Sequence, residues 1–207
     1  MDELVMLDLK QRKTGTIVII NGESSARKSS LLRAFLDAAA KPYLDMGLDS
    51  FLFSLSQRHL GLHWPELMAE ADHAGPMGHR IVRGMHRALA AEGNNVFADH
   101  VMVKPSRATD CAIVLATLRT YLIGLHCPAD VLETRERERK DRTLGHALKQ
   151  HKKVHQDLIY DLTIDSSTLS AVDCAHAVLQ HIDQHEPHAL MDMQHMLAEA
   201  DSGNGPT

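Results

Sequence analysis

The stretch Thr16-Ile-Val-Ile-Ile-Asn-Gly-Glu-Ser-Ser-Ala-Arg-Lys-Ser-Ser30 decides the fold of this chain. Residues 16 to 21 form an apolar, β-branched run that predicts a buried strand, and a helix is predicted from Lys28 onwards. The junction has the spacing of a phosphate-binding loop, G-x-x-x-x-G-K-[ST], with Gly22, Lys28 and Ser29 in position. Arg27 stands where the second glycine of that pattern belongs.

A loop of this kind binds anions, because its backbone N–H groups and the positive end of the following helix dipole converge on one point. We therefore predict an ATP site in which Lys28 reaches the β- and γ-phosphates and the Ser29 hydroxyl binds Mg²⁺. An ordinary strand–turn–helix junction is the alternative. The predicted nucleotide contacts in the loop are Gly22, Ser24, Ser25, Ala26, Arg27, Lys28, Ser29 and Ser30.

Arg27 leaves two outcomes open for the loop. Its side chain crowds the β-phosphate or strains the turn, because glycine there lets the backbone approach the phosphates without a Cβ. Alternatively the side chain points outward, since a residue at a helix start does not need a positive φ. The sequence does not choose between these outcomes.

Strand-like and helix-like segments alternate about five times along the chain. This alternation predicts an α/β fold, a three-layer α/β/α sandwich around a central parallel sheet of five strands. Residues 63–76 have the composition of a loop-rich insertion. The predicted strands are 16–21, 43–47, 96–99, 121–127 and 160–165. The predicted helices are 28–39, 51–60, 78–92, 106–119, 128–142, 144–155 and 170–185. We divide the chain into an N-terminal arm (1–14), one domain (15–186) and a partly disordered C-terminal tail (187–207).

Three aspartates follow predicted strands, and ligands of open parallel sheets bind at the carboxyl ends of strands. Asp49 would face the γ-phosphate and accept the proton of a substrate hydroxyl; its alternative role is a helix N-cap. Asp99 closes an apolar strand as a Walker B acid does, which makes it a candidate Mg²⁺ ligand; a turn residue is its alternative. Asp165 follows the last predicted strand.

An arginine-rich stretch predicts a small helical lid over about residues 137–150. Arginines on a lid neutralise charge on a transferring phosphoryl group and exclude water. We assign Arg139 and Arg142 to the lid, because the sequence after Asp141 breaks the helical pattern. Arg135 and Arg137 are instead interpreted as part of a solvated helix with i,i+4 ion pairs.

Composition restricts the classes of function. The 207 residues carry a formal net charge of −5, which disfavours nucleic acid as a partner. The sequence has no secretory leader and no run of about 18 apolar residues, so we expect a cytoplasmic protein without membrane contact. Three dispersed cysteines are interpreted as buried, and the i,i+4 pairs His151/His155 and His181/His185 as solvated helix faces rather than metal ligands. The sequence is compatible with a homo-oligomer.

Several segments together resemble the chloramphenicol phosphotransferase-like family of P-loop kinases. In family order across about residues 16 to 185, they are IINGESSARKS (19–29), GLDS (47–50), GMHRA (84–88), GNNVFADHV (93–101), GLHCPADVLETRE (124–136), KDR (140–142), VH (154–155) and YDLTIDSS (160–167). This set is far more specific than the loop alone.

The resemblance implies a P-loop kinase-like fold and transfer of the γ-phosphate of ATP to a hydroxyl of a small molecule. The named member of the family modifies chloramphenicol and so gives antibiotic resistance. By resemblance, Asp49 is the general base, Lys28 and Ser29 bind ATP·Mg²⁺, Arg139 and Arg142 are lid arginines, and Asp165 lies near the adenine.

Two departures from the family pattern bear on function. Arg27 replaces the family glycine, so a catalytically impaired pseudokinase or a nucleotide-binding or ligand-binding protein is the alternative to an O-phosphotransferase. The region 51–78, which should shape the acceptor pocket, does not follow the chloramphenicol enzyme, so the acceptor is not assigned as chloramphenicol. An NTPase or a kinase of nucleotides is a third hypothesis. The chain lacks the N-K-x-D element of guanine-specific GTPases.

Overall fold

A computed structural model describes residues 13–74, 76–138 and 146–203. At its centre lies a five-stranded sheet in the order β2-β3-β1-β4-β5, with every neighbouring pair parallel. The predicted α/β fold with a parallel sheet of five strands is therefore confirmed. The strands are β1 (Ile17–Asn21), β2 (Tyr43–Asp45), β3 (Asn95–His100), β4 (Thr120–His126) and β5 (Leu162–Asp165).

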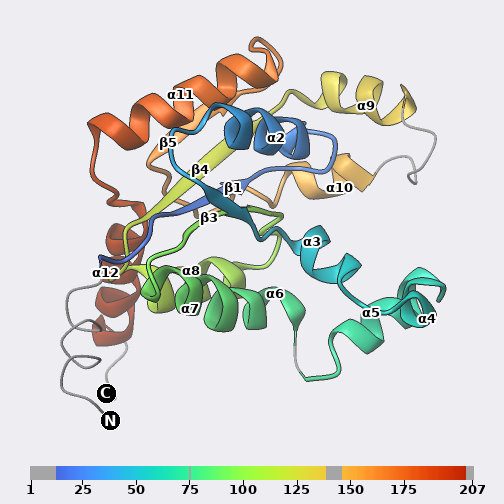
Figure 1. Cartoon of the computed structure of the whole chain (residues 1–207), viewed down its shortest axis with the longest axis horizontal. Coiled ribbons are helices and arrows are strands. Elements are labelled where there is room, and N and C mark those ends of the chain that lie inside the picture. Colours follow the sequence, from blue (N-terminus) through green and yellow to red (C-terminus); the bar gives the residue numbers. More distant parts are fainter. Residues whose placement is uncertain (1–12, 75, 139–145, 204–207) are drawn as a thin grey trace.

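Helices cover both faces of the sheet (Figure 1). One face carries α2 (Lys28–Ala38), α9 (Ala129–Glu138) and α11 (Ala171–Gln184). The other carries the π-helix η1 (Ile81–His86), α7 (Arg87–Ala91), α8 (Pro105–Leu115) and α12 (Ala189–Gly203). Beyond the end of β2 follow α3 (Leu48–Phe53), α4 (Gln57–Leu60), α5 (Trp64–Ala71) and α6 (Met77–Arg80). The short helix α10 (His146–His151) precedes β5 in the chain.

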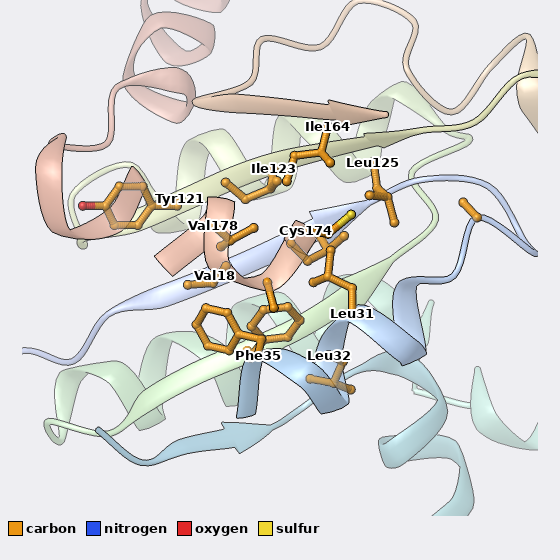
Figure 2. Packing of buried hydrophobic residues seen from close by; sticks show 14 of the residues in the cluster. Val18, Leu31, Leu32, Phe35, Tyr121, Ile123, Leu125, Ile164, Cys174 and Val178 are labelled. Carbon is orange, nitrogen blue, oxygen red and sulfur yellow. The ribbon is translucent and has the colours of Figure 1, made fainter. Parts of the chain in front are cut away.

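Strand β1 contributes to the hydrophobic cores on both faces of the sheet. Successive side chains of a strand point to opposite faces of the sheet. Val18 (Figure 2) packs on the α2/α11 side, as does Ile20, whereas Ile17 and Ile19 pack on the α8/α12 side. All four are fully buried, as the continuous apolar run predicted for a central parallel strand. Strand β1 is therefore the central strand of the sheet, and the loop follows its carboxyl end.

Helix α12 corrects the prediction that the chain loses its core pattern after Pro187. Ala189, Leu190 and Met193 are buried against the α8 side of the sheet. The first amides of the helix are bound by a residue that is distant in the sequence. His188 N and Ala189 N donate to Asp161 Oδ1 at 2.7 and 3.0 Å. Local sequence patterns could not reveal this cap, because Asp161 lies 27 residues from His188 in the chain. Residues 1–12 of the predicted arm and residues 204–207 lie outside the described residues.

The predicted loop-rich insertion at 63–76 contains the helix α5. Pro65, which suggested a loop, lies in the first turn of α5, where a proline has no intrahelical hydrogen bond to lose. The predicted helix at 51–60 is instead two helices, α3 and α4, because Ser56 between them is extended. This region forms a small core of its own around Leu52, Leu67 and Ile81.

Candidate active site

The loop between β1 and α2 closes around the ammonium group of Lys28. Lys28 Nζ donates to Gly22 O at 2.9 Å and to Glu23 O at 2.8 Å, and the side chain is buried. Gly22 is required sterically, because a Cβ there would lie 2.5 Å from Leu125 O. The neighbouring loop residues Ser24, Ser25 and Ala26 are buried, Ser29 is half-buried and Ser30 is exposed.

Arg27 adopts a left-handed backbone conformation, which glycine tolerates best. Its φ is 68°, in the left-handed region, so the prediction that this position needs no positive φ is wrong. For a non-glycine residue this conformation costs roughly 1–2 kcal/mol. The side chain nevertheless points outward, because Arg27 is exposed and lines a shallow depression with Leu31, Leu125 and Ser166. The turn is thus strained but its interior is not filled by the guanidinium group.

Acidic side chains gather at the carboxyl end of the sheet beside this loop. Burial raises the pKa of Asp99, and the charges of Asp49 and Asp45 add to the increase, whereas the charge of Lys28 lowers it. Close approach requires Gly47, since a Cβ there would lie 2.2 Å from Asp99 Oδ1. Asp49 lies exposed in the first turn of α3 and is not its N-cap, so the capping alternative is wrong.

Asp45 is a member of this acidic group that the sequence analysis missed. Its Oδ1 accepts hydrogen bonds from Ser50 Oγ at 3.0 Å and Gly47 N at 3.3 Å, which fixes the turn between β2 and α3. The available signal was its place at the end of a short strand, four residues before Asp49.

Two buried histidines contact one another at the end of β3. His86 from η1 and His100, the last residue of β3, are hydrogen-bonded between their Nε2 atoms at 3.1 Å. Burial lowers the pKa of His86 to about 4 and that of His100 well below its ordinary value, so both rings are neutral at pH 7. The positive charges of Arg107 and Lys28 reinforce the effect on His100.

We expect this pair to destabilise the protein in acid. His86 has a pKa of about 4 in the folded chain and about 6.5 when unfolded, so its contribution is complete above pH 6.5 and is lost as the pH falls. Between pH 7 and pH 5 the loss is about 2 kcal/mol. Urea unfolding at both pH values measures it, and in His86→Gln the difference should shrink by about this amount. An unchanged pH dependence in the variant would contradict the assignment.

The helix α10 contacts the phosphate-binding loop directly. Ser24 N donates to Gln150 Oε1 at 2.8 Å, and His151 Nδ1 lies 2.7 Å from Glu23 Oε1. The carboxylate of Glu23 is fully buried and lies 3.6 Å from His155 Nε2. Burial raises the pKa of Glu23, but the neighbouring His155, a backbone hydrogen bond and the hydrogen bond with His151 together outweigh burial and leave the pKa below its usual value.

The prediction that His151 and His155 form a solvated face is therefore wrong, because Glu23 of the loop is their common partner. His181 and His185 stack on one another with ring centroids 4.4 Å apart. In the described parts of the chain, no group of three or more histidine, cysteine or acidic residues is arranged to hold a metal ion. The three cysteines are buried and free, as predicted.

At the end of β5, Asp165 organises the turn that follows. Its Oδ1 accepts from Ser167 N and Ser167 Oγ at 2.7 and 2.6 Å, and these bonds lower its pKa. Arg135 was predicted to be solvated, but it reaches across to this turn. It donates to Ser166 O at 2.7 Å and to Ser166 Oγ at 3.2 Å. The sequence pattern around Arg135 could not indicate this contact, because Ser166 lies 31 residues away in the turn after β5.

The lid arginines cannot be placed with these groups. Arg139 and Arg142 lie outside the described residues, as does the whole stretch 139–145 of the predicted lid. The Arg137 guanidinium lies 3.9 Å from the Glu133 carboxylate, which confirms that i,i+4 pair. Among the described residues, no helix is long and apolar enough to cross a membrane.

Comparisons with known proteins agree with this geometry. Residues 15–183 match the model of a family described as chloramphenicol phosphotransferase-like protein. A Mycobacterium tuberculosis H37Rv protein named "Putative O-phosphotransferase" is 32% identical over 171 residues, which cover 74% of this chain and 76% of that protein.

Two solved kinases share the fold. One is the Mycobacterium tuberculosis APS kinase in complex with AMPPNP and APS, with a TM-score of 0.58 and 16% identity, covering 83% of this chain and 99% of that chain. The other is the Acinetobacter baumannii shikimate kinase in complex with shikimate, with a TM-score of 0.53 and 16% identity, covering 84% and 96%. At this identity the likeness shows the fold alone, that of P-loop kinases.

Proposed function

The chain belongs to the chloramphenicol phosphotransferase-like family, and from this premise we propose that it is an ATP-dependent O-phosphotransferase acting on a hydroxyl of a small molecule. One observation carries the proposal. The buried ammonium of Lys28 and the carboxylate of Asp49 both lie near enough to Asp99 to shift its pKa, at the end of the sheet where the loop begins. A lysine ammonium group and carboxylates at the same site are recurring parts of enzymes that transfer phosphoryl groups.

The loop has the chemistry that a triphosphate requires. Ser24 N already donates to a side-chain oxygen, that of Gln150, so a loop amide points toward an oxygen acceptor. Lys28 is held by Gly22 O and Glu23 O in the interior of the loop. The solved APS kinase, whose fold this chain shares, was crystallised with the ATP analogue AMPPNP. We propose that ATP is the phosphoryl donor here.

In the proposed reaction, the acceptor hydroxyl attacks the γ-phosphorus as its proton passes to the Asp49 carboxylate. The bond between the γ-phosphorus and the bridging oxygen breaks, and ADP leaves with the electron pair of that bond. Lys28 and the loop amides stabilise the negative charge on the non-bridging oxygens. We assign Arg139 and Arg142 the same role from the lid.

The oxygen donors Ser29 and Asp99 have the chemistry that magnesium prefers. Hydroxyl and carboxylate oxygens are the ligands that Mg²⁺ prefers, so Ser29 and Asp99 would hold it, directly or through water. The ion would neutralise phosphate charge. Burial and the charges of Asp49 and Asp45 raise the pKa of Asp99, and a bound cation would offset these effects by giving the carboxylate a counter-charge.

The alternative is a pseudokinase disabled by Arg27, and the exposure of the Arg27 side chain argues against it. We expect Arg27→Gly to change Mg·ATP affinity by less than about threefold, measured by calorimetry. The variant should also change the free energy of unfolding by less than about 1 kcal/mol, since relief of backbone strain is offset by a more flexible unfolded chain. A wild-type protein that binds no ATP, with binding restored in Arg27→Gly, would establish the alternative.

Turnover tests the proposal as a whole. The protein is incubated with Mg·ATP and a panel of hydroxylated metabolites and antibiotics, and products are analysed by mass spectrometry. We expect an acceptor-dependent mass gain of one phosphoryl group together with ADP release. ATP hydrolysis at the same rate with and without every acceptor would instead favour an NTPase.

A further inference from the structure

A cavity of about 250 Å³ is lined by residues outside the phosphate-binding loop, and none of the roles assigned above uses it. It lies between the start of α8 and the segment that follows α10. Its apolar lining consists of Met102, Val103, Pro105, Ala108 and Leu158. Pockets for drug-sized ligands occupy roughly 300–1,000 Å³, so this cavity suits a smaller, metabolite-sized molecule.

Asn21 ties this cavity to the loop. Its Oδ1 accepts from Met102 N at 2.8 Å, and its Nδ2 donates to Val154 O at 2.7 Å. The first bond holds the wall that follows β3, and the second holds the wall that contains Lys153. Asn21 is fully buried and directly precedes Gly22, so the two walls meet where the phosphate-binding loop begins.

The charge of the cavity is positive on one side. Lys153 and Gln156 are its two polar lining residues, and none of the seven lining residues is acidic. Lys153 is exposed whereas Met102 and Ala108 are buried, so the ammonium group lies on the solvent side of an apolar interior. A molecule with an apolar body and one anionic group complements this arrangement.

We propose that this cavity is the acceptor pocket and that the acceptor is a small hydroxylated molecule with an apolar body and an anionic group beside Lys153. The proposal rests on the phosphotransferase function given above. Met102 lies three residues after Asp99 in the chain, so the pocket opens at the catalytic end of the sheet. The region 51–78, which was expected to shape the acceptor site, contributes none of the lining residues. It packs into its own small core together with Ile81 from η1.

Binding without nucleotide tests the pocket separately from catalysis. The probes are 4-(hydroxymethyl)benzoate, its neutral amide 4-(hydroxymethyl)benzamide and the cation 4-(hydroxymethyl)benzylamine, titrated by calorimetry into the full chain. We expect the wild-type protein to prefer the benzoate to the amide by about fivefold, the size of one exposed ion pair. Lys153→Glu should reverse this preference in favour of the benzylamine. Lys152→Glu, an equal charge change at an exposed residue outside the lining, should leave it unchanged.

A steric variant adds a second measurement. Ala108→Leu fills the apolar interior and should weaken all three probes by at least about tenfold. Should that variant fail to fold, the Lys153→Glu reversal still decides. The proposal is overturned if no probe binds saturably up to about 10 mM, or if Lys153→Glu and Lys152→Glu bind the three probes alike.

The outcomes also separate the pocket from the reaction. Probe binding that follows the charge at residue 153, with no ATP-dependent phosphorylation of any hydroxylated compound, supports the pocket and contradicts the phosphotransferase. Phosphorylation of an acceptor whose KM is unaffected by Lys153→Glu and Ala108→Leu supports the reaction and overturns the pocket.

Discussion

Replacement of Asp49 by asparagine is expected to lower kcat for phosphotransfer by about 10²- to 10⁴-fold, the usual contribution of a positioned general base. Asparagine has nearly the same shape as aspartate but cannot accept the proton of the acceptor hydroxyl. Asp49 is exposed in the first turn of α3, so the substitution removes no buried contact. The loss should therefore appear in kcat, with nucleotide affinity and the free energy of unfolding little changed.

Asp37→Asn is the matched control for this variant. Asp37 is an exposed aspartate on α2, away from the loop end of that helix, and its replacement should leave turnover unchanged. Steady-state kinetics with the acceptor found in the mass-spectrometric screen gives kcat and KM for both variants. Phosphotransfer by Asp49→Asn within a few-fold of the wild-type rate would remove Asp49 from the mechanism.

Replacement of Lys28 by methionine should reduce kcat/KM for ATP by about 10²- to 10³-fold, because one preorganised donor to the developing phosphate charge is lost. Methionine keeps the length and the apolar stem of the side chain but removes its charge. Lys28 Nζ also holds Gly22 O and Glu23 O, so the loop itself should loosen in the variant. We therefore expect weaker ATP binding by calorimetry as well as slower turnover.

Lys41→Met provides the comparison for Lys28→Met. Lys41 is exposed in the turn after α2, so its replacement should alter neither binding nor turnover. Circular dichroism and urea unfolding establish that both variants are folded. Unimpaired ATP binding by Lys28→Met would mean that the loop does not hold the triphosphate through this residue.

The sequence predicted best the parts of the molecule that are made by neighbouring residues. Strand β1, the loop and α2 are contiguous, and their apolar run and G-x-x-x-x-x-K-S spacing indicate both conformation and chemistry. Asp99 followed from the rule that a parallel strand brings its carboxyl end to the ligand edge. The five parallel strands followed from the same alternation of local patterns.

Local sequence patterns could not predict contacts between residues that are distant in the chain. The i,i+4 spacing of His151 and His155 showed that they share a helix-like face, but their partner Glu23 lies 128 residues from His151. Likewise, Arg135 was interpreted as a solvated charge, but its guanidinium group donates a hydrogen bond to Ser166 O. In each case the sequence showed the type of residue, but it did not show which distant residue would contact its side chain.

The sequence by itself determined the phosphate-binding turn and the parallel sheet, because backbone propensity and hydrophobic periodicity act over a few residues. Tertiary structure alone decided that α10 lies on the loop, that Asp161 caps α12, and that Asn21 joins two walls of a cavity. These contacts depend on how the layers pack, since each joins a polar group to a partner that only the closed fold brings within hydrogen-bond distance.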